Sequence, residues 1–293
     1  MKEQKLIKNI FLTVFVLLFL TNIFFLVIAF SINNSIWLEI ILAVIFALLE
    51  TIIIVVLLTY YNDVLKVVGK NSGRIIRLEN LNHPLLQKLS NAAPGTYNHS
   101  LNVAQLATKA AKSAGIDPGY LRIGAYFHDI GKLKNPKIFI ENQKSPSEIS
   151  RQDLKKISHS IIDHVLYGQK LAREYNLPDE VIEYISQHHG SSEIYSLKEK
   201  LLRENLNAQY PGPKPLSKEA AILMLADSIE ARIRSMKSIS DENINKAIET
   251  EFAQKINDGQ IDLSGLSSQE LSLAKKSFIR TISAIYHNRK ARG

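Results

Sequence analysis

The sequence predicts an all-α protein in two parts, an N-terminal two-helix transmembrane hairpin followed by an α-helical bundle. Residues 10–30 and 36–60 form two runs with hardly any charge, and each is longer than the roughly 20 residues that cross a bilayer core. Beyond these runs apolar residues recur at helical spacing, and no convincing alternating pattern of a β-strand is visible. We therefore expect the hairpin at residues 1–62, a helical linker at 63–92 and the bundle at 93–293.

The hairpin is expected to hold the protein in the plasma membrane, with both termini and the bundle in the cytoplasm. Only the sequence SINNS separates the two apolar runs. Basic residues flank both runs, namely Lys2, Lys5 and Lys8 before the first and Lys66, Lys70, Arg74 and Arg77 after the second. The positive-inside rule places both flanks in the cytoplasm. A signal peptide is the rival interpretation, but the first run exceeds the usual ~7–15 residues and no small-residue cleavage site follows it.

Glu50 stands near the middle of the second apolar run, where a carboxyl group is expensive. The favoured interpretation is a protonated side chain that bonds to a neighbouring helix, including a helix of a second copy in a homodimer. Ion conduction or sensing is the less favoured alternative.

Charge and cysteine usage narrow the class of protein. The formal net charge is +8 and belongs to the region after residue 62, because the charges in residues 1–62 cancel. A basic region attracts an anionic substrate, nucleic acid or anionic lipid, and charge alone does not choose among them. The chain has no cysteine, which excludes disulfides and thiolate metal sites and fits a cytoplasmic bundle.

Local signals predict where the helices of the bundle begin and end. Ser217 and Ser240 are expected N-caps, Ser267 and Glu270 form an expected capping box, and Gly115 stops a helix. The expected helices are 98–114, Pro118 to His128, 158–176, Pro178 to His188, 217–234, 240–257 and Ser267 to Tyr286, with a loop at 205–216.

A scattered set of histidines and aspartates predicts a dinuclear metal site. It consists of His99, His128, Asp129, His164, His188, His189 and Asp227. Most of these residues stand on predicted apolar helices, where polar side chains are costly unless they are paired or bound. Imidazoles and carboxylates without thiolates suit transition metals better than magnesium or calcium. Two adjacent metals are an arrangement that splits phosphate esters.

Two adjacent pairs carry the sharpest local signal. Asp129 has two oxygens that can bridge two metals, and its neighbour His128 can bind one of them. His188 and His189 diverge by ~100° on a regular helix, so both reach one metal only where the helix ends. Gly190 supplies that end.

The other residues leave alternatives open. His159 and His164 point ~140° apart on a helix and compete for one place, and physics alone does not choose between them. Asp227 lies in an apolar helical run and needs a metal or a basic partner. His83 and His287 are expected on the surface.

Seven motifs together resemble the HD-domain metal phosphohydrolases, and more narrowly the PgpH-type membrane HD hydrolases that degrade cyclic di-AMP to linear pApA. The motifs are GTYNHS, AYFHDIGK, FIENQ, HVLYG, QHHG, YPGPKP and LADSIEA, and they cover about residues 80–288. The resemblance implies two ions of manganese or iron. It implies that His99, His128, Asp129 and Asp227 hold one ion, and that Asp129, His164, His188 and His189 hold the other. The family histidine precedes a short segment that ends in glycine, which selects His164, with Gly168, over His159.

The expected catalytic residues are Asp129 and Lys132, whose ammonium group could bind a phosphate oxygen. Arg232 and Arg234 could do the same, and for all three basic residues an exposed solubilising role is as plausible. The expected partners are a cyclic dinucleotide, membrane lipid and a second copy, with no stable nucleic-acid partner.

The chain departs from the family pattern in ways that leave competing functions. The family usually has a large extracellular domain and more membrane spans, and often a second histidine where Asn98 stands. GSSEIYS follows the histidine pair in place of the Gly-Tyr-Pro signature of cyclic di-GMP hydrolases. A membrane-anchored HD-domain RNA nuclease or another nucleotide phosphohydrolase is the alternative enzyme, although no GXXG loop of a KH module appears. A non-catalytic signalling module is the other alternative, and it predicts missing ligands.

Overall fold

The chain divides into two compact units, Met1–Gly73 and Arg74–Gly293. The computed structural model describes residues 75–143, 151–195, 197–206, 209–236 and 238–290, with Gly73 and scattered residues between 21 and 57. Most of the predicted spans at 10–30 and 36–60 lies outside these residues. Among the helices that the structure does describe, none combines the length and hydrophobicity needed to cross a bilayer.

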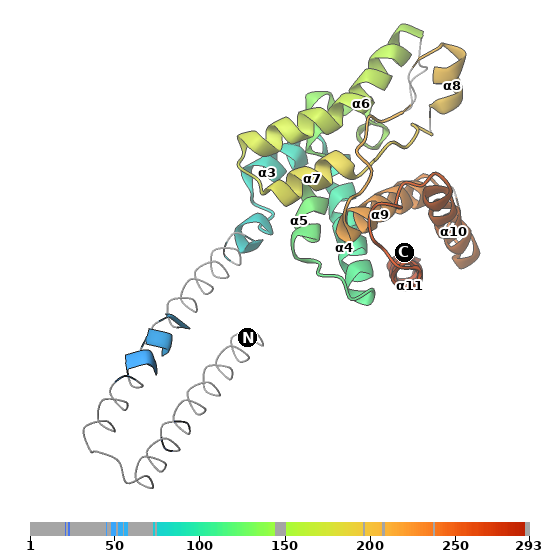
Figure 1. Cartoon of the computed structure of the whole chain (residues 1–293). Coiled ribbons are helices and arrows are strands. Elements are labelled where there is room, and N and C mark those ends of the chain that lie inside the picture. The colour runs from blue at the N-terminus through green and yellow to red at the C-terminus, as the bar shows by residue number, and fades with distance from the viewer. Residues whose placement is uncertain are drawn as a thin grey trace, which may run out of the picture. The chain divides into compact units, whose positions relative to one another are not determined.

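The second unit is all-α, as predicted (Figure 1). Its α-helices are α3 (Pro84–Ala92), α4 (Pro94–Ser113), α5 (Gly119–Phe127), α6 (Arg151–Glu174), α7 (Asp179–Gln187), α8 (Lys198–Arg203), α9 (Lys218–Ser235), α10 (Asp241–Asn257) and α11 (Ser268–Lys290). Three short 3-10 helices join α5 to α6, namely η1 (Ile130–Lys134), η2 (Pro136–Ile138) and η3 (Ile140–Asn142). The extended pairing in the described residues is a single isolated bridge between Glu193 and Gln209.

The predicted caps form the expected hydrogen bonds. The Ser217 hydroxyl accepts from the Ala220 amide at 3.2 Å, and the Ser240 hydroxyl accepts from the Asn243 amide at the same distance. Ser267 and Glu270 form the reciprocal capping box: the Ser267 amide donates to the Glu270 carboxylate at 2.8 Å, and the Glu270 amide donates to the Ser267 hydroxyl at 3.2 Å. These three helix starts are therefore fixed locally. Helix α6 instead begins at Arg151, earlier than the predicted residue 158.

Helix α4 is the centre of the unit and contacts α3, α5, α9 and α11. Its buried face carries small side chains, including Ala104, Ala107, Ala110 and Ala111. Because these side chains are short, the neighbouring helices approach its backbone closely. Helix α9 meets α4 along a face that is almost wholly buried from Ala220 to Ile233.

A second apolar cluster packs α3, the first helix of the unit, against the end of α5 and the start of η1. Leu85, Leu86 and Leu89 of α3 are buried against Phe127 and Ile130. Helix α3 therefore forms part of the core of this unit.

The histidine at the start of α3 is less exposed than the sequence suggested. His83 accepts a hydrogen bond from the Leu85 amide at 3.3 Å and packs edge-on against Phe127 at 5.1 Å. It is half-buried, and thus lies at the surface with one side of its ring covered. The side chain of His287 lies outside the described residues.

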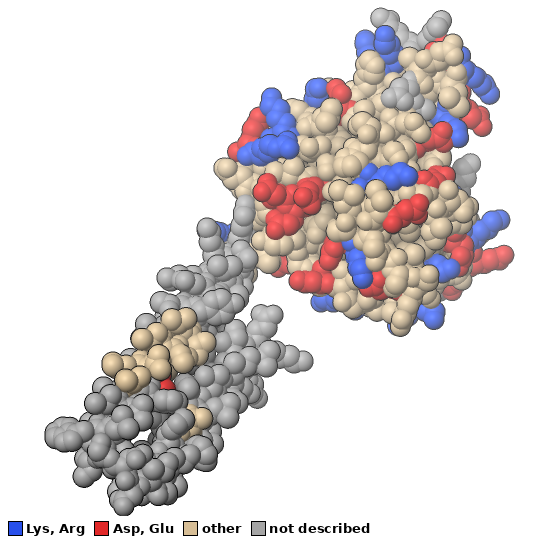
Figure 2. Space-filling model, in the orientation of Figure 1, with Lys and Arg blue, Asp and Glu red and all other residues tan. Residues whose placement is uncertain are grey.

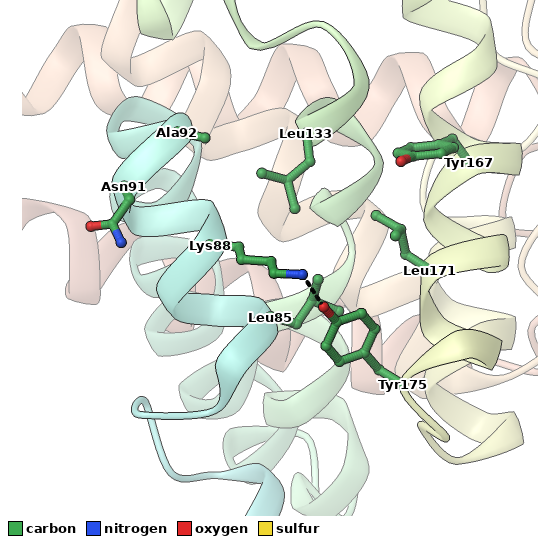
Figure 3. A pocket seen from close by; sticks show the side chains of 8 residues that line it. All are labelled: Leu85, Lys88, Asn91, Ala92, Leu133, Tyr167, Leu171 and Tyr175. Carbon is green, nitrogen blue, oxygen red and sulfur yellow. Dashed lines mark hydrogen bonds between the residues drawn. The ribbon is translucent and has the colours of Figure 1, made fainter.

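Charged side chains of both signs alternate on the face of the unit seen in Figure 2. The net positive charge is thus not gathered into one patch on that face. A pocket of about 440 Å³ opens between α3, η1 and α6 (Figure 3). Lys88 donates to the Tyr175 hydroxyl across it, above a floor that includes Leu85, Leu133 and Leu171. The pocket contains none of the predicted metal ligands.

Candidate metal centre

The seven predicted ligands come together at one buried point, although they span residues 99 to 227. His99 lies on α4, His164 on α6 and Asp227 on α9. His128 ends α5, and Asp129 begins η1. His188 and His189 follow directly after α7. Six of the seven residues are buried, and only the His189 side chain is noticeably exposed, at 22%.

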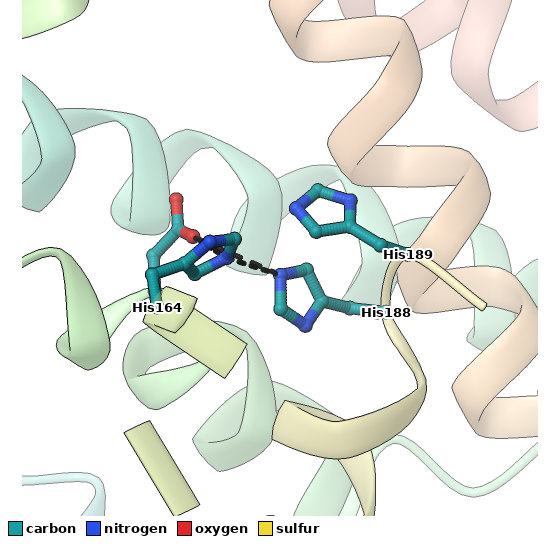
Figure 4. A group of neighbouring side chains, drawn as sticks. His164, His188 and His189 are labelled. Carbon is teal, nitrogen blue, oxygen red and sulfur yellow. Dashed lines mark hydrogen bonds and ion pairs between the residues drawn. The ribbon is translucent and has the colours of Figure 1, made fainter. Parts of the chain in front are cut away.

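The ligand atoms fall into two groups. Asp129, His164, His188 and His189 form one group, and His99, His128 and Asp227 form the other. Figure 4 shows His164 of α6 facing His188 and His189, which come from the turn after α7. The two groups have the same histidine membership as the two ligand sets that the family resemblance implies.

The Asp129 carboxylate faces both groups at once. Its Oδ1 lies 3.4 Å from His164 Nε2 and 3.8 Å from His188 Nε2. Its Oδ2 lies 3.4 Å from His128 Nε2 and 3.7 Å from His99 Nε2. One oxygen is therefore directed to each group, which is the geometry that a bridging carboxylate requires.

The separations between ligand atoms fit metal ions. Two atoms that are each about 2.1 Å from one ion lie roughly 3.0–3.4 Å apart at tetrahedral to octahedral angles. In the first group His164 Nε2 lies 3.2 Å from His188 Nε2. In the second, His99 Nε2 lies 2.9 Å from Asp227 Oδ1, and His128 Nε2 lies 3.8 Å from the same oxygen. The spacings therefore lie close to those of a ligated pair.

Unpaired polar atoms support the same fit. His128 Nε2 and Asp129 Oδ1 are buried without a hydrogen-bond partner. The Nδ1 atoms of His164 and His188 donate to backbone carbonyls, so their Nε2 lone pairs face each other. Such an arrangement is costly unless a cation lies between the lone pairs. The residues present thus suit a pair of transition-metal ions.

Local helix geometry fixes the orientation of the histidines that end or line a helix. His128 Nδ1 donates to the Ala125 carbonyl at 2.8 Å, and His188 Nδ1 donates to the Ile185 carbonyl at 2.8 Å. His164 uses the carbonyl of Ile161 in the same way. Each imidazole bonds the residue three positions earlier, which leaves Nε2 as the free lone pair. A partner on the second ring nitrogen is the usual means of orienting a metal-binding histidine.

Glu230 plays that part for His99, and the sequence analysis missed it. The Glu230 carboxylate accepts from His99 Nδ1, and it also accepts from Asn102 at 3.2 Å and from Arg234 at 3.1 Å. Its position one helical turn after Asp227 was the available signal, because residues three apart share a helix face.

Two glycines explain why His164 enters the centre and His159 does not. A Cβ at Gly131 would lie 1.7 Å from the His164 carbonyl oxygen, so only glycine lets η1 lie against α6 there. Gly168 of α6 lies opposite Gly131, and a Cβ added at Gly168 would lie 3.3 Å from the Gly131 nitrogen. This contact places His164 beside Asp129. His159 is exposed on another side of α6.

Lys132 lies beside the centre but is already engaged. Its Nζ is 2.7 Å from Asp129 Oδ2 and 2.7 Å from Glu141 Oε1. Glu141 also accepts from the Thr96 hydroxyl at 3.0 Å, which ties η3 to the start of α4. The role of Glu141 was not visible in the sequence, because it depends on contacts with Lys132 and Thr96.

The two arginines of α9 are directed to carboxylates outside the cluster. Arg232 bonds Glu251 of α10, and Arg234 bonds Glu230. Both side chains are therefore occupied by structural ion pairs in this state.

The electrostatics keep the carboxylates ionised. Burial alone would raise the pKa of Asp129, but Lys132 and His128 outweigh it and hold that pKa well below its usual range. Burial opposes the charged form of Asp227 too, but the neighbouring His128 and His99 outweigh it and hold the pKa of Asp227 well below its usual range.

The histidines divide into two kinds. Burial lowers the pKa of His188 to about 3, so it is neutral, as a metal ligand must be. Burial also opposes the charged form of His128, but Asp129 and Asp227 raise its pKa to about 10. A metal that binds His128 must therefore displace a proton.

The all-α fold with its buried histidine and aspartate cluster is that of an HD domain. Residues 96–232 match the family model described as HD domain. Cyclic-di-AMP phosphodiesterase PgpH of Bacillus subtilis is 40% identical over 227 residues, and that of Listeria monocytogenes is 34% identical over 224. The crystal structure of the L. monocytogenes PgpH HD domain superimposes with a TM-score of 0.67 at 34% identity, covering 70% of this chain and 100% of that one. The chain belongs to the HD-domain family, among the relatives of PgpH.

These similarities concern one part of the relatives. The two PgpH alignments cover 74% of this chain but 31% of each relative, so the chain spans about a third of their length. The L. monocytogenes HD domain has also been solved in complex with cyclic di-AMP, and that structure superimposes with a TM-score of 0.66 at 33% identity. Ribonuclease Y of Malacoplasma penetrans is a more distant relative, 25% identical over 61% of this chain and 34% of its own length.

Proposed function

We propose that the protein is a membrane-anchored, dinuclear-metal phosphodiesterase that hydrolyses a cyclic dinucleotide, cyclic di-AMP to linear pApA. The observation that carries this proposal is the Asp129 carboxylate, with one oxygen toward each of two histidine groups. Two-metal sites of this kind are suited to displacement at phosphorus. The PgpH relatives and the complex of a related domain with cyclic di-AMP support the choice of substrate.

The proposed ligand sets share Asp129. His99, His128 and Asp227 complete one set, and His164, His188 and His189 complete the other. We assign manganese or iron, because imidazole and carboxylate donors without thiolates suit such ions. When bound, the ions supply the activation of a water molecule and the neutralisation of charge on the phosphate oxygens.

The protein's own residues orient the phosphodiester. The Lys132 ammonium group contacts both Asp129 and Glu141. We propose that it donates a hydrogen bond to a non-bridging phosphate oxygen of the substrate. Glu230 and the carbonyls of Ala125, Ile161 and Ile185 hold four imidazoles in the tautomer that presents Nε2. The histidines therefore do not need to turn when metal enters.

Membrane anchoring through residues 10–30 and 36–60 is part of the proposal. The apolar runs and their basic flanks support it, with both termini in the cytoplasm. Because the chain has no cysteine, the topology can be tested with single introduced thiols. Ser35→Cys should react with a membrane-impermeant maleimide in intact cells, whereas Ser235→Cys should react only after lysis. The reverse pattern would contradict this orientation.

The function is tested with the full chain purified in detergent and supplied with Mn²⁺. A panel of cyclic di-AMP, cyclic di-GMP, ppGpp and short RNA should show turnover of cyclic di-AMP to pApA well above the others. The isosteric Asp129→Asn variant should lose that turnover while its circular dichroism spectrum stays unchanged. Preferential cleavage of RNA would favour the nuclease alternative that the ribonuclease Y relatives represent. Two bound metals without turnover of any substrate would favour a signalling module.

A further inference from the structure

His189 differs from the other four histidines of the centre in how it is held. Those four each bond a carbonyl or carboxylate through Nδ1. His189 directs its Nδ1 toward Asp227 Oδ2 at 3.6 Å, and in the described part of the chain no hydrogen bond anchors its other ring nitrogen. It is also the most exposed of the five, so its orientation needs another source.

The backbone explains why the carbonyl anchor is missing. Helix α7 ends at Gln187, and Gly190 has a φ of +54°, so the chain turns away directly after His189. His188 still bonds the carbonyl of Ile185, three residues earlier. His189 leaves from the turn itself, and in the described residues its ring makes no hydrogen bond to a helical carbonyl.

Tyr210 lies flat against His189. Their ring centroids are 4.1 Å apart with an interplanar angle of 23°, while the Tyr210 ring meets His164 edge-on at 6.2 Å. Tyr210 belongs to the segment after α8, far from His189 in the sequence. Its ring therefore covers the one imidazole that hydrogen bonds do not fix.

Hydrogen bonds hold Tyr210 in place. Its amide donates to the carbonyl of Ser192, three residues after His189, at 3.0 Å. The same segment is fixed again at Leu216, whose amide donates to the buried Gln187 side chain at 2.8 Å. The 210–216 segment is thus fastened to both sides of the turn that carries His188 and His189.

We propose that Tyr210 is a positioning residue that fixes the His189 imidazole by ring stacking, in the place of the hydrogen bond that orients each of the other four histidines. The proposal rests on the metal centre of the proposed function. The aromatic ring is the working part, and its hydroxyl is not required. Outer partners of metal ligands commonly contribute about 10–100-fold to metal affinity, which sets the expected effect.

The test uses the full chain in detergent and Mn²⁺ titration of the metal-free protein, so that binding is read without substrate. Tyr210→Phe should keep both metal equivalents within about threefold of the original affinity. Tyr210→Leu should weaken one of the two equivalents by about tenfold or more, and Tyr210→Trp should restore it. Turnover of Tyr210→Leu should recover at high Mn²⁺ with KM unchanged.

Tyr195→Leu is the matched control, because Tyr195 is exposed and bonds Asp258 away from the centre. It should bind both equivalents normally. Normal affinity in a folded Tyr210→Leu variant would overturn the proposal, and so would a loss in Tyr210→Phe equal to that in Tyr210→Leu. Two normal metal equivalents without hydrolysis of cyclic di-AMP would instead contradict the proposed substrate and leave the effect of Tyr210 measurable.

Discussion

Replacing Gly131 by alanine tests whether the contact between η1 and α6 sets the geometry of the cluster. The new Cβ would lie 1.7 Å from the His164 carbonyl oxygen and 2.6 Å from the Gly168 nitrogen. Both neighbours are backbone atoms, so no side-chain rotation relieves the clash. The two backbones must separate, and they carry Asp129 on one side and His164 on the other.

The size of the effect follows from these distances. To bring the Cβ to even 3.0 Å from the carbonyl oxygen, the backbones must move apart by about 1.3 Å. Metal–ligand distances tolerate about 0.2 Å. We therefore expect loss of the ion between Asp129 and His164, and a fall in turnover of about 100-fold or more. Overpacking should cost only about 1–3 kcal/mol of stability, so the protein should stay folded.

Metal content by elemental analysis and turnover of cyclic di-AMP measure the two effects, with circular dichroism as the check on folding. Gly73→Ala is the matched control, because among the described residues its Cβ would meet nothing within 4 Å. Gly168→Ala should be intermediate, since its nearest neighbour is the flexible Ile185 side chain at 3.0 Å. A folded Gly131→Ala variant with two bound metals and full turnover would refute the reasoning.

Three further predictions follow from burial and charge. His164→Ala should lose metal by elemental analysis while His159→Ala on the same helix stays near normal, because the first side chain is buried beside Asp129 and the second is exposed; equal losses would contradict the assignment. Because the pKa of His128 is raised to about 10, bound metal must displace its proton, so affinity measured by Mn²⁺ titration should fall about tenfold for each pH unit below that value; a flat profile between pH 8 and pH 6 would argue against His128 as a ligand. A chain that begins at residue 74 should fold without detergent and bind metal, whereas one that begins at residue 93 should show no cooperative unfolding transition in a thermal melt. Burial of the three leucines of α3 contributes about 1.5–3 kcal/mol each, which is a large share of a total stability of about 5–15 kcal/mol.

Structural features that depend on residues close together in the chain, such as helix caps, could be predicted from the sequence. The caps at Ser217 and Ser240 and the box of Ser267 with Glu270 depend on side chains that bond their own first turn, and the structure has all three. The seven centre residues were predictable by type, because His and Asp on apolar helices need partners. The start of α6 at Arg151 was missed, although Ser150 before it and Asp153 in its first turn are typical start signals in the sequence.

The supporting residues could not be predicted in the same way. Glu230 contacts His99 across 131 positions, and Tyr210 stacks on His189 from a loop without helical or strand periodicity. Glutamate and tyrosine are ordinary surface residues until the fold brings a ligand beside them. Pairwise contacts between distant segments leave no mark in the spacing of a single sequence, so the outer layer of the centre becomes visible only in the structure.

The ammonium group of Lys132, which contacts two carboxylates, bears on the order in which cations and substrate bind. In the protein alone this group is held by Asp129 and Glu141, and Asp227 and Glu230 are further buried carboxylates of the centre. A phosphodiester that arrives first meets the Asp129 and Glu141 carboxylates and a lysine donor that both of them already hold. Asp129 and Asp227 would hold the dications, and Lys132 would then keep Glu141 as its partner and be free of Asp129. We therefore expect ordered binding, in which the protein binds cyclic dinucleotide tightly only after the cations have bound. The cation concentration would then control the affinity for substrate.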